Sequence, residues 1–137
     1  MLCRAWLAQL EQDRQAFEQA GMRVVAVGFG EPKHARVWCP RLAPSHTCLC
    51  TPDGSAHAAY GLRRGTVAQL ASLGTLRAGA RALAAGQVQG KATGDQAMLS
   101  ATFIVDAAGT IRWAYYSRHP GDDPSLEAIR SAAVSPA

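Results

Sequence analysis

The sequence predicts an α/β fold, and three stretches of the chain carry that prediction. Residues 3–20 repeat apolar side chains at helical spacing. Residues 22–29 are short, nearly continuous in apolarity and rich in β-branched residues, which predicts a strand buried on both faces, as in a parallel sheet, and residues 101–106 predict a second buried strand. Because both patterns occur within 137 residues, we expect one domain over residues 1–137, with a sheet and flanking helices.

The first helix is expected over residues 3–20, with Gly21 as its cap. Its apolar side chains fall on one face and its charged side chains on the other. Cys3 stands in the first turn, where the positive end of the helix dipole favours a thiolate, and Arg4 adds a fixed positive charge beside it. We therefore predict Cys3 and Arg4 as the catalytic residues.

Residues 22–60 predict a strand, a helix, a second strand and a short helix. The helix should cover residues 33–41, with Val37 and Trp38 facing inward and Pro40 fraying its end. Residues 46–50 predict the second strand. The turn at residues 51–54 should place a glycine at positive φ, and the short helix at residues 55–60 should follow it.

Residues 63–91 predict a basic helical insertion before the last strands. They carry several arginines, and no acidic residue occurs between Asp53 and Asp95. We expect one or two helices, broken near Gly74 and Gly79, with a solvated basic face. Apolar residues recur along the stretch, spaced at three from Val67 through Leu70 and Leu73 to Leu76 and continuing with Leu83 and Val88. The stretch lacks the aromatic residues that stack bases or anchor interfaces, so we expect neither a nucleic-acid nor a membrane partner.

The chain is expected to close with a hairpin and a helix. Residues 101–106 and 110–116 should pair as antiparallel strands around the turn at residues 107–109. The last helix should begin in residues 122–129, with an acidic cap and Pro124 in its first turn. Residues 134–137 should be frayed.

The composition is that of an ordinary soluble chain, with 48% hydrophobic and 18% charged residues and a net charge of +4. No apolar run is long enough to span a bilayer, and charged residues interrupt any signal-like stretch near the start. We therefore expect a cytoplasmic, reducing location, in which the four cysteines are thiols or redox groups rather than structural bridges.

His46, Cys48 and Cys50 alternate along the predicted strand and should share one face of it. These ligand types suit zinc or copper(I), but an extended strand spaces them by about 6–7 Å per residue pair, which is too far for one ion. Burial as small apolar side chains is the favoured interpretation, and we predict no metal and no cofactor. A Cys48–Cys50 disulfide would be strained. Cys39, on the preceding helix, is either a resolving thiol or a packing residue.

The order and spacing of the motifs resemble the peroxiredoxin-like proteins of the alkyl hydroperoxide reductase/thiol-specific antioxidant group, which have a thioredoxin-like fold. The resemblance covers nearly the whole chain. It is carried by Cys3-Arg4 at a helix start, Val24–Gly30, Pro52-Asp53-Gly54 with Tyr60-Gly61-Leu62, Thr102–Asp106 with Gly109, Ile111-Arg112, and Ser117-Arg118. It implies a thioredoxin-like sheet with flanking helices and a thiol-dependent antioxidant oxidoreductase. The substrate would be a peroxide or a disulfide, and a thiol would be the reductant.

The chain departs from that family pattern at its start. The family's reactive cysteine is the first of Cys-x-x-Cys, whereas Cys3 matches the second, and the strand that leads into this turn is missing. Met98–Ala101 stands where such enzymes place an arginine before the Thr-Phe-Ile strand. We therefore expect an N-terminally truncated domain of impaired activity. The alternative is a non-catalytic thioredoxin-like binding module or a truncated fragment.

The missing strand would lie between residues 22–29 and 101–106, at the centre of one sheet. Without it, these two strands must pair directly, leave a gap, or take a strand from another chain. Unpaired strand edges are costly when buried and adhesive when exposed. We therefore expect poor stability or a homo-oligomer formed through the unpaired edge.

Overall fold

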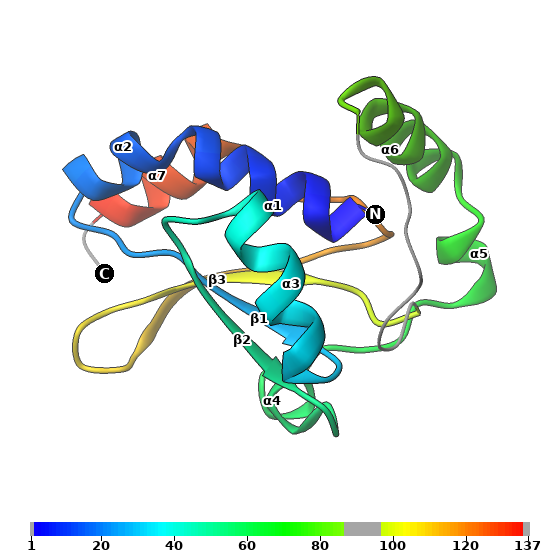
Figure 1. Ribbon diagram of the computed structural model, residues 1–137, viewed down its shortest axis with the longest axis horizontal. Coiled ribbons are helices and arrows are strands. Elements are labelled where there is room, and N and C mark those ends of the chain that lie inside the picture. The colour runs from blue at the N-terminus through cyan, green and yellow to red at the C-terminus, as the bar shows by residue number, and fades with distance from the viewer. Residues whose placement is uncertain (1, 87–96, 136–137) are drawn as a thin grey trace.

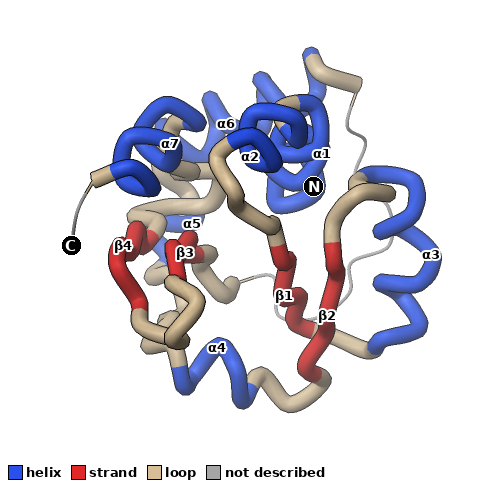
Figure 2. The backbone as a smooth tube through the Cα atoms, turned by 90° about the vertical axis from the view of Figure 1, so that its left-hand side faces the viewer, coloured by secondary structure: helices blue, strands red, loops and turns tan. Residues whose placement is uncertain are grey.

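The computed structural model describes residues 2–86 and 97–135 of the chain. Its first helical segment, predicted as one helix, is divided into α1 (Leu2–Gln12) and α2 (Arg14–Gln19) by a change of backbone direction at Asp13. Leu7 and Phe17 are buried, as the apolar pattern predicts. Gly21 ends the segment at φ 70°, in its predicted role. In Figures 1 and 2 the helices α1, α2 and α7 lie together on one side of the strands.

The strands β1 (Val25–Phe29) and β2 (Thr47–Thr51) form a parallel pair in which Val27 lies opposite Leu49. Parallel pairing was expected, but burial of residues 22–29 on both faces is wrong. Val25, Val27 and Leu49 share one face and remain about half exposed, at 45%, 46% and 53%. The opposite face packs against α3 (Pro32–Leu42). Only one face of this small sheet is therefore covered.

The α3 helix turns a different face inward from the one predicted. Ala35 and Cys39, one turn apart, are buried, whereas Val37 is 59% exposed. Trp38 does face the sheet, near Gly28. Pro40 lies inside the helix, which continues to Leu42 instead of fraying there.

The turn after β2 leads into α4 (Ser55–Ala59) and depends on Gly54. Gly54 has φ 69°, and a Cβ atom built there would lie 2.2 Å from the ring of Phe29. The predicted glycine at positive φ is confirmed. The ring of Phe29 in turn contacts His57 edge to face.

The insertion forms α5 (Val67–Leu70) and α6 (Leu73–Ala84), and the break falls at Ala71 and Ser72 rather than at the glycines. Thr66 and Ser72 cap the two helices through their hydroxyls, so the chain can restart a helix there. Both Gly74 and Gly79 lie within α6. Its buried face consists of Ala78 and Ala82, while Leu73, Leu76 and Leu83 are exposed. The predicted end of the insertion, residues 87–91, lies outside the described residues.

The predicted antiparallel hairpin is confirmed by β3 (Ala101–Val105) and β4 (Ile111–Tyr116). Asp106 organises its turn, because Oδ1 accepts hydrogen bonds from the backbone N–H groups of Ala108 and Thr110, each at 2.9 Å. The pKa of Asp106 is held below its usual range, first by the Thr110 N–H and then by the Arg112 side chain.

The last helix, α7 (Leu126–Val134), starts later than predicted. Its cap is Ser125, whose hydroxyl accepts from the Ala128 N–H at 3.1 Å, and not an acidic residue. Asp122 is engaged with Tyr115 and Arg118 instead. Of the tail predicted to be frayed, residues 136–137 lie outside the described residues.

The strands form two separate two-stranded sheets, β1–β2 and β3–β4, which Figure 2 shows apart from each other. The expectation that strands 22–29 and 101–106 share one sheet is therefore wrong. Of the three arrangements considered for these two strands, the structure has the one in which a gap separates them. The fold is nevertheless mixed α/β, with small sheets and flanking helices, consistent with a thioredoxin-like fold. Within the part of the chain that is described, no helix is long and apolar enough to cross a membrane.

Candidate functional site

Cys3 lies in the first turn of α1 and carries a free, solvent-exposed thiol. Although Cys3 is exposed as a residue, desolvation raises the pKa of its thiol. The carboxylate of Asp123 raises it further, and only the N-terminal amine and a backbone hydrogen bond act in the other direction. The expectation that this position favours a thiolate is wrong, because burial and Asp123 outweigh the helix terminus.

Arg4 is half-buried beside Cys3, but its charge is not among those that shift the pKa of the thiol. An effect of the Arg4 charge on the thiol was expected because the two residues are adjacent in the sequence. On a helix, consecutive side chains point about 100° apart, so a neighbour in the sequence need not be a neighbour in space.

Asp123 comes from the segment between β4 and α7, which sequence reasoning did not single out. Burial raises its pKa to about 6, and the charge of Asp122 adds to this rise, while Arg81 and His119 oppose it. The carboxyl group therefore changes its protonation state near neutral pH. A group of this kind beside a thiol is suited to accept and return a proton.

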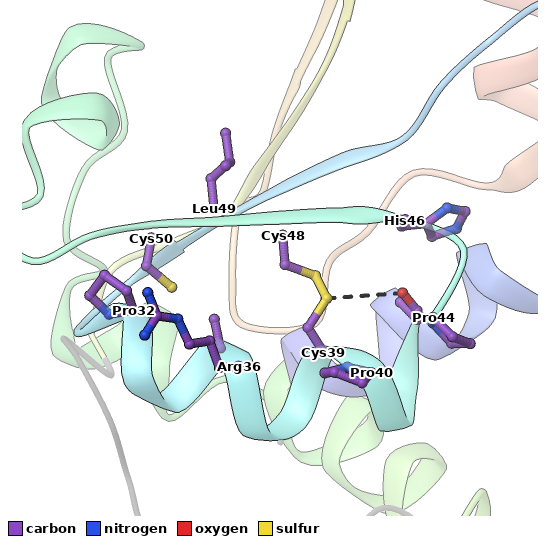
Figure 3. A pocket seen from close by; sticks show the side chains of 11 residues that line it. Pro32, Arg36, Cys39, Pro40, Pro44, His46, Cys48, Leu49 and Cys50 are labelled. Atoms are coloured by element: carbon purple, nitrogen blue, oxygen red, sulfur yellow. Dashed lines mark hydrogen bonds between the residues drawn. A yellow bond between two sulfur atoms is a disulfide. The ribbon is translucent and has the colours of Figure 1, made fainter.

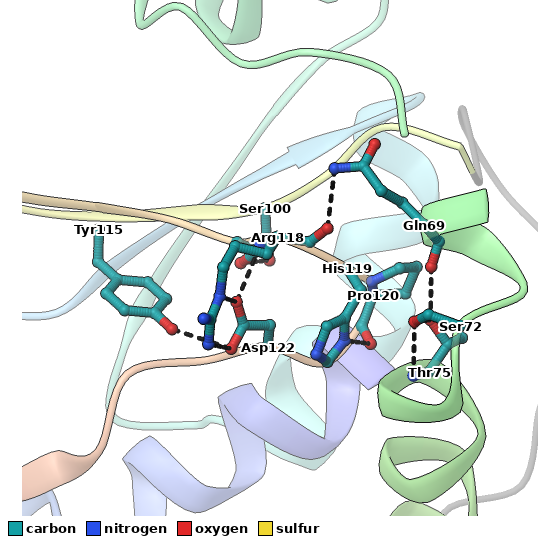
Figure 4. Close-up of polar contacts among 10 residues, drawn as sticks. Gln69, Ser72, Thr75, Ser100, Tyr115, Arg118, His119, Pro120 and Asp122 are labelled. Atoms are coloured by element: carbon teal, nitrogen blue, oxygen red, sulfur yellow. Dashed lines mark hydrogen bonds and ion pairs between the residues drawn. The ribbon is translucent and has the colours of Figure 1, made fainter. Parts of the chain in front are cut away.

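Asp122 has the opposite character to its neighbour and holds the loop in place (Figure 4). Burial alone would raise its pKa, but the side chain and backbone N–H of Arg118 and the hydroxyl of Tyr115 outweigh burial and lower the pKa to about 2. The bonds to Asp122 measure 2.9 Å from Tyr115 Oη, 2.8 Å from the Arg118 N–H and 3.0 Å from Arg118 Nε. The two adjacent aspartates thus have separate tasks, and Asp122 fixes the loop that presents Asp123.

A cavity of about 580 Å³ opens between this loop and α6. Asp123 lines it together with Arg77, Arg81 and His119. The ring of His119 packs on Gly74, where a Cβ atom would lie 2.4 Å from Nε2. Cys3 is not among the lining residues, but α1 packs against α6 and the charge of Asp123, which does line the cavity, acts on the Cys3 thiol. Two guanidinium groups and an imidazole there can meet an anionic or strongly polar oxidant.

The structure pairs Cys39 of α3 with Cys48 of β2 as a disulfide, with a Cα–Cα distance of 6.4 Å. Of the two interpretations given for Cys39, packing as a free thiol is therefore wrong, whereas the expectation of thiols or redox groups rather than structural bridges stays a prediction. Cys39 and Cys48 are only nine positions apart, but the disulfide requires that α3 turn the face carrying Cys39 toward β2. Which face of α3 packs on β2 could not be predicted from the sequence. Cys50 remains free and half-buried. The strained Cys48–Cys50 alternative does not occur.

His46, Cys48 and Cys50 do line one cavity, as their alternation predicted, but they do not converge. His46 Nε2 lies 3.6 Å from Oε2 of Glu11, and Cys48 is bonded to Cys39. No group of three or more potential metal ligands occurs among the residues described.

Taken together, the fold and the site define a class. The chain is an α/β protein with small sheets and flanking helices, and it presents a free, exposed cysteine at a helix start. The family model of the AhpC/TSA antioxidant enzymes matches residues 9–119, and the chain belongs to that family. The matched range begins after Cys3 and Arg4. No curated protein and no solved structure matches the chain.

Proposed function

We propose that this chain is a thiol-dependent oxidoreductase that reduces a peroxide or a disulfide at Cys3 and takes its electrons from an external thiol. The observation that carries the proposal is the exposed residue Cys3, whose thiol feels the charge of Asp123, a residue that lines a cavity together with Arg77, Arg81 and His119. Membership of the AhpC/TSA family supports thiol-dependent antioxidant chemistry. A cytoplasmic location belongs to the same proposal, because the cycle consumes reduced thiols.

One cysteine is enough to balance the cycle. The Cys3 sulfur attacks a peroxide oxygen, so that an S–O bond forms, the O–O bond breaks and a sulfenic acid remains. Asp123 accepts the thiol proton and returns it to the departing oxygen, which leaves as an alcohol or water. A first thiol condenses with the sulfenic acid to give a mixed disulfide and water. A second thiol displaces Cys3 as its thiol and leaves as the oxidised disulfide.

The raised pKa of Cys3 predicts slow turnover at neutral pH, because only the thiolate attacks. Arg4, in the same helical turn, is proposed to help bring polar oxidants to the thiol. Arg4→Gln should therefore slow the reaction without abolishing it.

The direct test is peroxide consumption by the full chain with dithiothreitol as donor. We expect Cys3→Ser to fall to the uncatalysed rate, while Cys50→Ser, the other free thiol, keeps the rate of the unaltered chain. Equal rates in Cys3→Ser and the unaltered chain would remove Cys3 from the mechanism.

A non-catalytic binding module is the competing function, and two observations favour it: Cys3 lies outside the matched range, and the pKa of its thiol is raised. An unaltered chain that consumes neither peroxide nor a small disulfide above background would support this alternative.

A further inference from the structure

We propose that Cys39–Cys48 is a second, redox-active site, a disulfide reduced by an anionic low-molecular-weight thiol that enters the cavity between α3 and β2. The proposal does not depend on the reactivity of Cys3. It assigns to this cavity a ligand class, small thiols with carboxylate groups, and a reaction, thiol–disulfide exchange.

The first argument is access. A cavity of about 500 Å³, within the range of sites for small molecules, opens onto the disulfide (Figure 3). Cys48 is half-buried and Cys39 is buried, so the two sulfurs are not equivalent. In the proposed exchange the sulfur of the less buried residue, Cys48, is attacked and Cys39 is the leaving group.

The second argument is the surroundings of the leaving sulfur. Cys39 Sγ lies 3.9 Å from the carbonyl oxygen of Ala43, one turn further along the chain. Once the disulfide is open, the Cys39 thiol can donate its proton to this oxygen, so the reduced form has a hydrogen-bond acceptor ready. Reduction therefore leaves no buried thiol without a partner.

The third argument is the charge and chemistry of the cavity wall. Arg36 lies on α3, one turn before Cys39, and lines the same cavity. A guanidinium group at this place can hold a carboxylate of the incoming thiol. Cys50 lines the cavity as well, but desolvation raises its pKa, so it is a poor attacking group and serves as the internal control.

The exchange balances in two steps. The external thiolate attacks Cys48 Sγ, a mixed disulfide forms, the Cys39–Cys48 bond breaks and Cys39 takes up a proton. A second external thiolate attacks the sulfur of the bound thiol, releases Cys48 as a thiol and leaves as the oxidised external disulfide. Two electrons thus pass from two external thiols to the protein.

The experiment uses the full chain carrying Cys3→Ser, so that failure at Cys3 cannot be mistaken for failure here. The chain is equilibrated with reduced and oxidised glutathione at several ratios, quenched with acid and blocked with a maleimide, and free thiols are counted and mapped by mass spectrometry. We expect one free thiol, Cys50, in the oxidised chain and three in the reduced chain, with Cys39 and Cys48 appearing together. Cys50→Ser should show the same transition with one thiol fewer.

The mixed disulfide and the charge effect supply separate checks. In Cys39→Ser, glutathione should remain on Cys48 and not on Cys50; should this variant not fold, the quenched unaltered chain is mapped for the same adduct. Arg36→Gln should slow reduction by glutathione roughly two- to fivefold, the effect of one exposed ion pair, and leave reduction by uncharged 2-mercaptoethanol unchanged.

Three results would overturn the proposal. The first is a pair that stays oxidised at every glutathione ratio until denaturant is added. The second is three free thiols in the air-oxidised chain. The third, equal slowing of both reductants by Arg36→Gln, would remove the anionic thiol as the ligand.

Discussion

At the scale of single residues, Gly54 carries two constraints that can be separated. Its φ of 69° strains any residue with a Cβ atom, and the Phe29 ring occupies the place of that atom. Gly109, with φ 84°, has the same backbone strain and no neighbour within 4 Å. The pair therefore distinguishes strain from packing.

We expect Gly109→Ala to lower the free energy of unfolding by about 1–2 kcal/mol, the cost of the left-handed conformation. Gly54→Ala should cost about 1–3 kcal/mol more, because the added methyl displaces the ring. Urea denaturation of both variants measures the difference. Equal losses of unfolding free energy in the two variants would show that the Phe29 ring moves aside at no cost.

After desolvation, the charge of Asp123 is the second cause that raises the pKa of the Cys3 thiol, and its effect can be tested by alkylation. At pH values above about 6 Asp123 is charged and raises the pKa of the Cys3 thiol. Asp123→Asn should therefore shift the pH profile of iodoacetamide alkylation to lower pH, measured in Cys50→Ser so that Cys3 is the one free thiol. Glu127→Gln removes the same charge from the exposed first turn of α7 and should leave the profile in place. An unchanged pH profile in Asp123→Asn would contradict the influence of the Asp123 charge on the Cys3 thiol.

Sequence reasoning found the residues whose role is local and missed those whose role depends on folding. Cys3 at a helix start, Gly21 and Gly54 at turns could all be predicted, because each depends on its own few neighbours. Asp123 acts on a residue 120 positions away in the chain, and no spacing rule links the two. The Cys39–Cys48 bond depended on which face α3 turns to the sheet.

At the scale of elements, Glu11 ties α1 to the segment between α3 and β2. Its buried carboxylate accepts from the Ser45 N–H at 3.2 Å and lies 3.6 Å from both Arg14 and His46. Removing it leaves a backbone donor unpaired.

We expect Glu11→Ala to lower the free energy of unfolding by about 1–3 kcal/mol, the usual cost of an unsatisfied buried group. Glu18→Ala, on the exposed side of α2, should change it by less than about 0.5 kcal/mol. Thermal and urea denaturation check both values. Similarly small changes of unfolding free energy in both variants would show that only the apolar face of α1 holds this helix against the rest of the protein.

Element types and order could be predicted well, and faces and ends less well. Hairpin strands, the parallel strand and the helices follow from apolar periodicity, which is a local property. The apolar spacing did not reveal the inward face of α6, because Ala78 and Ala82 are buried there while Leu73, Leu76 and Leu83 are exposed. The start of α7 was wrong because Asp122 is held by Arg118 and Ser125 caps in its place.

At the scale of the whole molecule, the two sheets leave apolar surface uncovered. The accessible surface is 8698 Å², against about 6,900 Å² for a compact monomer of 14.5 kDa. Val25, Val27 and Leu49 are exposed on one sheet and Val105 and Ile111 on the other. Each sheet has two strands, so β1 and β3 each keep an edge that pairs with no named strand.

We therefore propose that the chain self-associates through these strand edges. Sedimentation velocity should show a weight-average mass that rises with concentration, and Val27→Lys on the exposed face should weaken the association. A monomer at all concentrations with a cooperative melt would contradict it.

The proposed function depends on Cys3 as the reactive thiol, and site-resolved oxidation tests this role most directly. The full chain is treated with a small excess of hydrogen peroxide in the presence of dimedone, which traps sulfenic acids, and peptides are mapped by mass spectrometry. We predict the adduct at Cys3, its loss in Cys3→Ser, and far less at Cys50. An adduct at Cys50 with Cys3 unmodified would contradict the account.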